Sequence, residues 1–151
     1  MSLKDDLVLE KYKYVLSQKQ ALNEATFKII TVYQALVLAL FAGQFAVVTA
    51  TKDKLPVESG LYASWVLLAL FVMISLLVLA LLVGGVFSWL SYRQDESELA
   101  SKYKVAVAAK KPVAWADVLR WYETYLVLFV VGFGGLTVYG FVKYIPAIFA
   151  G

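Results

Sequence analysis

The strongest constraint on the fold is a run of 34 residues without a charged side chain, from Ser59 to Tyr92. Two further uncharged runs are Ile29–Thr51, with 23 residues, and Thr124–Val142, with 19. A helix needs about 20 apolar residues to cross the ~30 Å hydrocarbon core of a bilayer, and it satisfies its own backbone where water is absent. The sequence therefore predicts an all-α integral membrane protein with three transmembrane helices.

Composition supports this class and excludes several chemistries. The chain has 151 residues, of which 62% are hydrophobic and 17% charged, so it fits a single small membrane domain over residues 1–151. Cysteine and histidine are both absent. Their absence excludes disulfides, thiol chemistry, Cys/His zinc sites and a histidine base. The first 28 residues are charged throughout, so we expect no cleavable signal peptide.

Basic residues set the expected orientation. Eleven lysines and arginines fall in the N-terminal segment and in the connection between the second and third runs, against three in the first connection and the C-terminal end. The positive-inside rule then places the N-terminus in the cytoplasm and the C-terminus outside, in a cell (inner) membrane. The expected segments are a cytoplasmic helix (5–28), a first span (29–51), an outer turn (52–60), a second span (61–92), a cytoplasmic connection (93–120), a third span (121–145) and an outer tail (146–151).

The stretch Asp5–Thr51 is predicted to be one unbroken helix, because it holds no proline and its first glycine is Gly43. Its cytoplasmic part has two apolar series. The first comprises Val8, Tyr12, Val15, Leu22 and Ile29, interrupted by Lys19 and Thr26; the second comprises Leu9, Leu16, Asn23 and Ile30 at seven-residue spacing. This periodicity favours a buried face, and a short coiled coil with Asn23 setting its register is one interpretation. Asn23 as a polar residue at the membrane boundary, or the whole segment lying flat on the membrane, are the alternatives.

The second uncharged run is longer than a bilayer requires. At about 1.5 Å per residue its 34 residues span roughly 50 Å, so the helix must tilt or project. We expect it to continue from Tyr92 toward Ala109 and to form an antiparallel cytoplasmic stalk with residues 5–28. Alternatively, Ser97 caps a separate helix. Pro112 is expected to restart the chain before the third span, where Glu123 forms an ion pair with Arg120 or is a buried functional carboxylate.

The candidate site residues are polar or small. Thr31, Gln34 and Gln44 lie within the first span, where they either bond to a neighbouring helix or line a pore after oligomerisation. Small residues in the second and third spans favour close helix packing, within one chain or between copies. These small residues are Ala80, Gly84, Ser88, Gly132, Gly135 and Gly140.

Candidate groups for catalysis are missing. No acid–base pair, nucleophile arrangement or metal-spaced cluster occurs in the chain, so we expect no enzyme and no cofactor. The run Gly132-Phe133-Gly134-Gly135 lacks the lysine and Ser/Thr of a phosphate-binding loop. A net charge of +3 is too mild to indicate nucleic acid.

Three short runs carry a resemblance to a known group. EKYKYVL (10–16), LNE (22–24) and FKII (27–30) lead directly into a span with a hairpin partner. Over about residues 5–110 this arrangement resembles small prokaryotic defence-associated transmembrane effectors of the SLATT type, although a two-span module lacks the third span. The resemblance implies an oligomeric inner-membrane effector that a cytosolic sensor triggers to permeabilise the membrane.

Three functions follow from these features. The first is a homo-oligomeric membrane effector or pore-type component, with a cytosolic protein partner at residues 5–28 and 93–120. The second is a scaffold or accessory subunit of a larger membrane complex. The third, a holin-like lysis protein, ranks below the other two. The predicted orientation is reversed relative to that group, and the tail Ile145–Gly151 is apolar.

Overall fold

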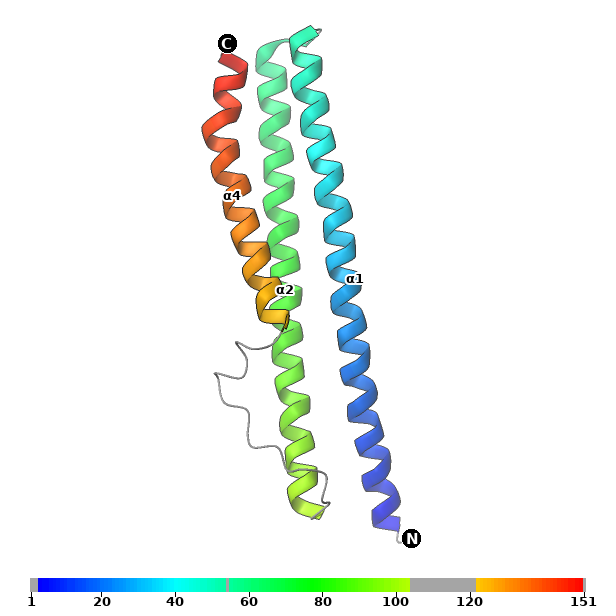
Figure 1. Ribbon diagram of the computed structural model, residues 1–151. Coiled ribbons are helices and arrows are strands. Elements are labelled where there is room, and N and C mark those ends of the chain that lie inside the picture. Colours follow the sequence, from blue (N-terminus) through cyan, green and yellow to red (C-terminus); the bar gives the residue numbers. More distant parts are fainter. Residues whose placement is uncertain (1–2, 54, 104–121, 151) are drawn as a thin grey trace. The chain divides into compact units, whose positions relative to one another are not determined.

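The computed structural model describes residues 3–53, 55–103 and 122–150. All of these residues except Leu55 and Pro56 are helical. The helices are α1 (Leu3–Asp53), α2 (Val57–Tyr103) and α4 (Tyr122–Ala150) (Figure 1). All three are long and apolar enough to cross a membrane, which confirms the all-α class and the three candidate spans.

Helix α1 is continuous over its 51 residues. The segment between Asn23 and Ile30, where charged sequence gives way to apolar sequence, is helical throughout. The prediction of one unbroken helix over Asp5–Thr51 is therefore confirmed. No residue in this segment removes a backbone donor or frees the backbone, so the i to i−4 hydrogen bonds continue through the change in polarity.

The connection between α1 and α2 is shorter than the predicted turn at 52–60. Helix α1 ends at Asp53 and α2 begins at Val57. The Leu55 N–H donates to the Ala50 carbonyl at 2.9 Å, and the Gly60 N–H donates to the Pro56 carbonyl at 3.1 Å. Pro56 immediately precedes α2, and its carbonyl accepts the hydrogen bond from Gly60 in the first turn of the helix.

Helix α2 passes through Ser97 without a break, so the alternative of a separate helix starting there is wrong. The Ser97 hydroxyl donates to the Gln94 carbonyl at 2.8 Å, which is a bond back into the same helix rather than an N-cap. The expected continuation to Ala109, the restart at Pro112 and the Arg120–Glu123 ion pair involve residues outside the described part of the chain.

Helix α4 continues past the predicted end of the third span at residue 145. Pro146 lies inside the helix, which ends at Ala150. A proline this close to the C-terminus removes one hydrogen bond near the last turn, where the backbone is least constrained, so the helix tolerates it.

The chain forms two compact units. The first comprises Met1–Lys28 and Leu81–Leu126, and the second comprises Ile29–Ala80 and Val127–Gly151. Both units contain parts of α1 and α2. The single membrane domain over 1–151 stays a prediction.

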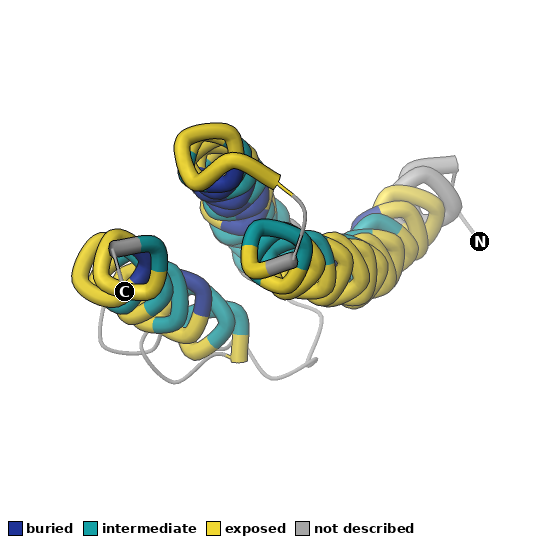
Figure 2. The backbone as a smooth tube through the Cα atoms, turned by 90° about the horizontal axis from the view of Figure 1, so that it is seen from above, coloured by how far each residue is buried: buried dark blue, intermediate teal, exposed yellow. Residues whose placement is uncertain are grey.

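Buried positions on α1 recur every eleven residues. Val15, Thr26 and Val37 are buried at this spacing, and a second set at the same spacing consists of Leu22, Tyr33 and Gln44, of which Tyr33 is buried and the others half-buried. Eleven residues make three turns of about 3.67 residues, close to the 3.6 of a straight helix. The buried positions therefore keep to one side of the helix, while exposed residues cover the rest (Figure 2).

This period also separates the two apolar series of the N-terminal segment. Leu9 and Leu16, from the series with seven-residue spacing, are exposed, while Val15 and Thr26 from the other series are buried. The Thr26 hydroxyl donates to the Leu22 carbonyl at 3.0 Å, so its polar group is satisfied within the helix. Thr26 therefore belongs to the buried face that it was expected to interrupt.

Candidate functional site

Two polar pairs join α1 to α2 inside the second unit. Tyr33 Oη and Ser75 Oγ lie 3.1 Å apart and share a buried hydrogen bond. Gln44 Nε2 donates to Ser64 Oγ at 2.8 Å. Tyr33 and Gln44 are eleven residues apart on α1, and Ser64 and Ser75 are eleven apart on α2, so both pairs follow the same repeat. Sequence reasoning missed Tyr33 and Ser64; this common spacing is the signal that would have found them.

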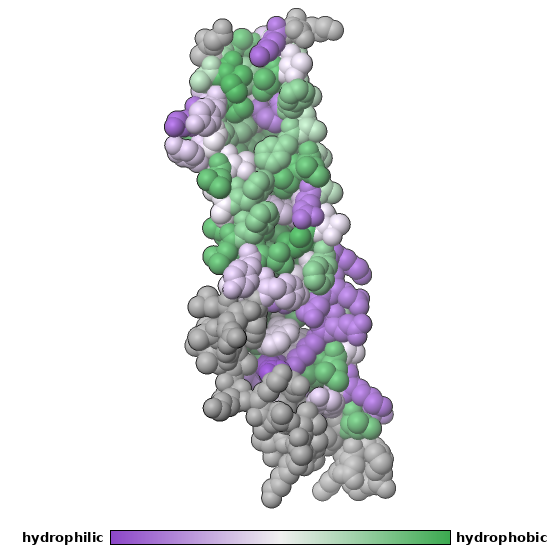
Figure 3. Space-filling model, in the orientation of Figure 1, coloured by the Kyte–Doolittle hydropathy of each residue, from purple (hydrophilic) through white to green (hydrophobic). Residues whose placement is uncertain are grey.

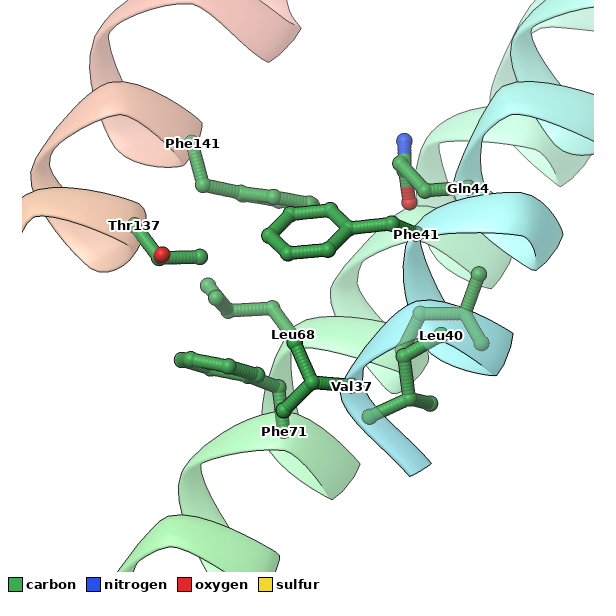
Figure 4. A pocket seen from close by; sticks show the side chains of 9 residues that line it. Val37, Leu40, Phe41, Gln44, Leu68, Phe71, Thr137 and Phe141 are labelled. Carbon is green, nitrogen blue, oxygen red and sulfur yellow. The ribbon is translucent and has the colours of Figure 1, made fainter. Parts of the chain in front are cut away.

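Gln44 also lines a small pocket (Figure 4). Its volume is about 30 Å³, which is room for one or two water molecules, and α1, α2 and α4 all contribute to it. The lining residues are Val37, Leu40, Phe41, Gln44, Leu67, Leu68, Phe71, Thr137 and Phe141. Gln44 Oε1 is buried and has no hydrogen-bond partner. A space this small and this apolar is a packing defect rather than a cofactor site.

Aromatic rings hold α4 against the other helices in the second unit. Phe133 meets Phe41 and Phe71 at centroid distances of 6.1 and 6.3 Å, and Phe141 meets Trp65 at 5.5 Å. These edge-on and tilted arrangements are the ones that ring quadrupoles favour. Contacts between α4 and the other helices in this unit are therefore mostly apolar.

The three predicted pore residues are not brought together. Gln44 turns toward α2, whereas Thr31 and Gln34 are exposed. No hydrogen bond to Gln34 is found among the described residues. The structure thus gives Gln44 the interhelical role, and it leaves Thr31 and Gln34 on the outer face of α1.

In the first unit, α1 and α2 contact each other around Trp89. Lys19 Nζ lies 5.5 Å from the centre of the Trp89 indole, and the Arg93 guanidinium carbon lies 5.6 Å from it. Both distances are typical of cation–π contacts. The position of a Gly85 Cβ would lie 4.0 Å from Leu22. Leu22 and Gly85 therefore lie close together.

Asn23 bonds to α4 rather than to α2. Tyr122 Oη donates to Asn23 Oδ1 at 3.2 Å, and the Tyr122 ring stacks on Phe27 with a centroid distance of 5.7 Å. Tyr122, in the first turn of α4, is thus attached to α1 through this hydrogen bond and this ring stack. A role for Asn23 in the register of the cytoplasmic helices stays a prediction.

The outer faces of α1 and α2 in the first unit differ in polarity. Gln20, Glu24 and Lys28 are exposed on α1, and Gln20 Nε2 donates to Glu24 Oε1 at 3.1 Å. We call these three residues the polar face of α1. Hydrophilic side chains gather over this N-terminal half of α1 (Figure 3).

Helix α2 presents an uncharged outer face at the same level. Leu81, Gly84, Phe87 and Ser91 are exposed there, with 62% of Phe87 accessible. We call these four residues the uncharged face of α2. The closeness of Leu22 to the position of a Gly85 Cβ places the polar face of α1 and the uncharged face of α2 at one height.

The predicted small-residue positions are open to the outside. Ala80, Gly84 and Ser88 are exposed. A Cβ atom built at Gly84, Gly132, Gly135 or Gly140 would have no atom within 4 Å. These glycines therefore do not serve close packing between the described helices of one chain, which is one of the two arrangements considered for them from the sequence. Gly60 differs, because a Cβ there would collide with Thr51 and lie 2.9 Å from the Phe149 ring.

Residues suited to metal binding do not cluster within the described ranges: no group of three or more Asp or Glu side chains that could hold a metal ion is found there. The polar groups on these helices instead bond to one another, stack or face outward.

Comparisons of the chain with protein-family models, with curated proteins and with solved structures find no match.

Proposed function

We propose that this chain is a non-enzymatic, oligomeric inner-membrane protein that acts as a membrane effector or pore-type component under the control of a cytosolic partner. In this proposal the N-terminus is cytoplasmic, and the charged parts of α1 and α2 form a helical stalk that receives the partner. The observation that most supports this proposal is the contrast in polarity between the polar face of α1 and the uncharged face of α2 at one level of the first unit.

In a single copy, neither lipid nor water is a favourable environment for both faces. If lipid surrounded this level, Glu24 and Lys28 would each cost about 2.5–3.5 kcal/mol at full depth in the membrane. If water surrounded it, Leu81 and Phe87 would be left exposed beside Trp89, where membrane proteins usually meet the headgroups. An assembly in which α1 turns toward the other copies and α2 turns toward lipid satisfies both faces.

The exposed glycines support self-association. Gly132 and Gly135 on α4 leave space for a neighbouring helix to approach closely. In the polar pairs Tyr33–Ser75 and Gln44–Ser64, the side chains form hydrogen bonds to each other within one chain. A lumen in the assembly would therefore be lined by the outer side of α1 and not by these groups.

The proposal is tested by the mass of the detergent-solubilised particle together with cross-linking in membranes. The chain has no cysteine, so Glu24→Cys introduces the only thiol. We expect a particle of several identical copies, in which a flexible bis-maleimide links Glu24→Cys between copies far more efficiently than the matched variant Phe87→Cys. A monomer contradicts the proposal, and a stable complex with one other protein and no self-linking supports the scaffold function instead.

A further inference from the structure

We infer that Leu38, Ala42 and Phe45 of α1 form a hydrophobic gate that keeps the resting assembly closed to ions. This inference rests on the proposed function, since it requires the outer side of α1 to face the same side of other copies across a narrow lumen. The inference specifies where the permeation path is blocked and which side chains block it.

The gate residues form one line on the outer side of α1 within the second unit. Gln34, Leu38, Ala42, Phe45 and Thr49 follow one another at steps of four, four, three and four residues, which is the spacing of a single helix face. All five are exposed. The buried residues Tyr33 and Val37 belong to a neighbouring face of the helix, about 100° around its axis from Gln34 and Leu38, which follow them in the sequence.

The middle of this line is apolar and its ends are polar. Leu38 is 70% accessible and Phe45 is 75% accessible. On the cytoplasmic side the line begins with Gln34, and Thr31 lies one turn earlier. On the opposite side it reaches Thr49, whose hydroxyl donates to the Phe45 carbonyl at 2.9 Å, and then Lys52. At about 1.5 Å per residue, Leu38 and Phe45 are roughly 10 Å apart along the axis.

The polar residues identify what this face meets. Gln34 is exposed five residues after Ile29, where the uncharged run starts, and an amide that faces hydrocarbon there is unfavourable. A face that places Gln34 away from lipid also places Leu38 and Phe45 away from lipid, because all three share it. Rings of such apolar side chains around a narrow lumen exclude water and block ions by dewetting.

The test compares ion leak through vesicles that contain purified assemblies. A polar side chain in the gate should hold water in the constriction, so Leu38→Asn and Phe45→Asn should raise the leak by about tenfold or more without any partner. The matched controls are Met73→Asn on α2 and Leu136→Asn on α4, which change equally exposed apolar residues on other helices. These controls should leave the leak at its resting value.

A second measurement avoids variants that fail to assemble. Phe45→Cys is assembled first and is then modified with a charged methanethiosulfonate, which adds a polar group to an existing gate. A rise in leak on modification supports the gate. Complete modification without a rise overturns it, even where Glu24→Cys cross-linking shows that the oligomer exists. If Glu24→Cys also fails to cross-link between copies and modification of Phe45→Cys does not raise the leak, the proposed function is overturned as well.

Discussion

At the scale of single residues, the Gln44–Ser64 pair stands out because only one of the two polar atoms of the Gln44 amide has a hydrogen-bond partner. The amide nitrogen of Gln44 donates to Ser64, while the amide oxygen is buried without a partner. The two sides of this contact therefore differ in what their removal leaves behind. An unsatisfied buried polar group costs about 1–3 kcal/mol, more than the net gain from most hydrogen bonds.

We predict that Ser64→Ala destabilises the protein more than Gln44→Leu does. Ser64→Ala leaves the whole amide of Gln44 buried without a partner and should cost about 1–3 kcal/mol. Gln44→Leu removes the orphaned oxygen together with the hydrogen bond, and should change stability by less than about 1 kcal/mol. Reversible unfolding in mixed detergent micelles measures both values. A larger loss for Gln44→Leu would contradict this assignment of the pair.

Among the described glycines, Gly60 is the one at which a side chain would collide with its neighbours. A Cβ at this position would meet both the Thr51 side chain and the Phe149 ring. We expect Gly60→Ala to destabilise the protein by about 1–3 kcal/mol through overpacking. Thr51→Ala in the same chain should recover part of this loss, because it removes the closest atoms.

The control for this prediction is Gly134→Ala, where a Cβ meets open space. This change should be neutral or stabilise α4 by up to about 1 kcal/mol through helix propensity. Equal effects of Gly60→Ala and Gly134→Ala in thermal unfolding would show that the close approach at Gly60 is absent.

At the scale of elements, α4 is the helix with the fewest buried residues. Of its described residues, Val130 and Ile145 are buried, and its first turn is held to α1 through Tyr122. Segments with few buried contacts open locally at low free-energy cost. The start of α4 should therefore open easily when the contacts of Tyr122 are removed.

We predict graded opening of the first turns of α4 when Tyr122 is changed. Tyr122→Phe loses the hydrogen bond to Asn23 but retains the stack on Phe27, so amide exchange at residues 126–129 should rise by a few-fold. Tyr122→Leu loses both contacts and should raise it by tenfold or more. Amides near Phe141 serve as the internal reference and should be unchanged. Identical exchange in both variants would show that the ring stack contributes nothing.

The elements were largely predictable from the sequence, but their ends and pairings were not. The absence of proline from Asp5 to Thr51 was enough to predict that α1 is continuous. The start of α2 at Val57 and the continuation of α4 beyond Pro146 depend on how one proline is placed near a helix end, which composition does not determine.

The site was predictable only in part, for a physical reason. Gln44 was recognisable as a costly polar residue in an apolar run, but its partner Ser64 depends on the register between two helices. That register follows an eleven-residue period, whereas the seven-residue series containing Leu9 and Leu16 pointed to a different face, and both of those leucines are exposed. Small residues likewise suggested packing within the chain, although Gly132 and Gly135 face open space.

At the scale of the whole molecule, the proposed function requires the polar face of α1 and the uncharged face of α2 to have different surroundings. The polar face should meet water or other copies, and the uncharged face should meet lipid. The gate at Leu38 and Phe45 depends on this same division. A scaffold role differs at this scale, because a partner subunit would then cover the uncharged face of α2.

The most direct test is a spin-label scan of the assembled protein in vesicles, with single cysteines on both faces. Labels at Gln20, Glu24 and Gln34 should be accessible to a water-soluble nickel chelate and poorly accessible to oxygen, which concentrates in lipid. Labels at Leu81, Gly84 and Phe87 should show the reverse. Oxygen accessibility that is equally high on both faces would contradict the account, because it would place the polar face of α1 in lipid.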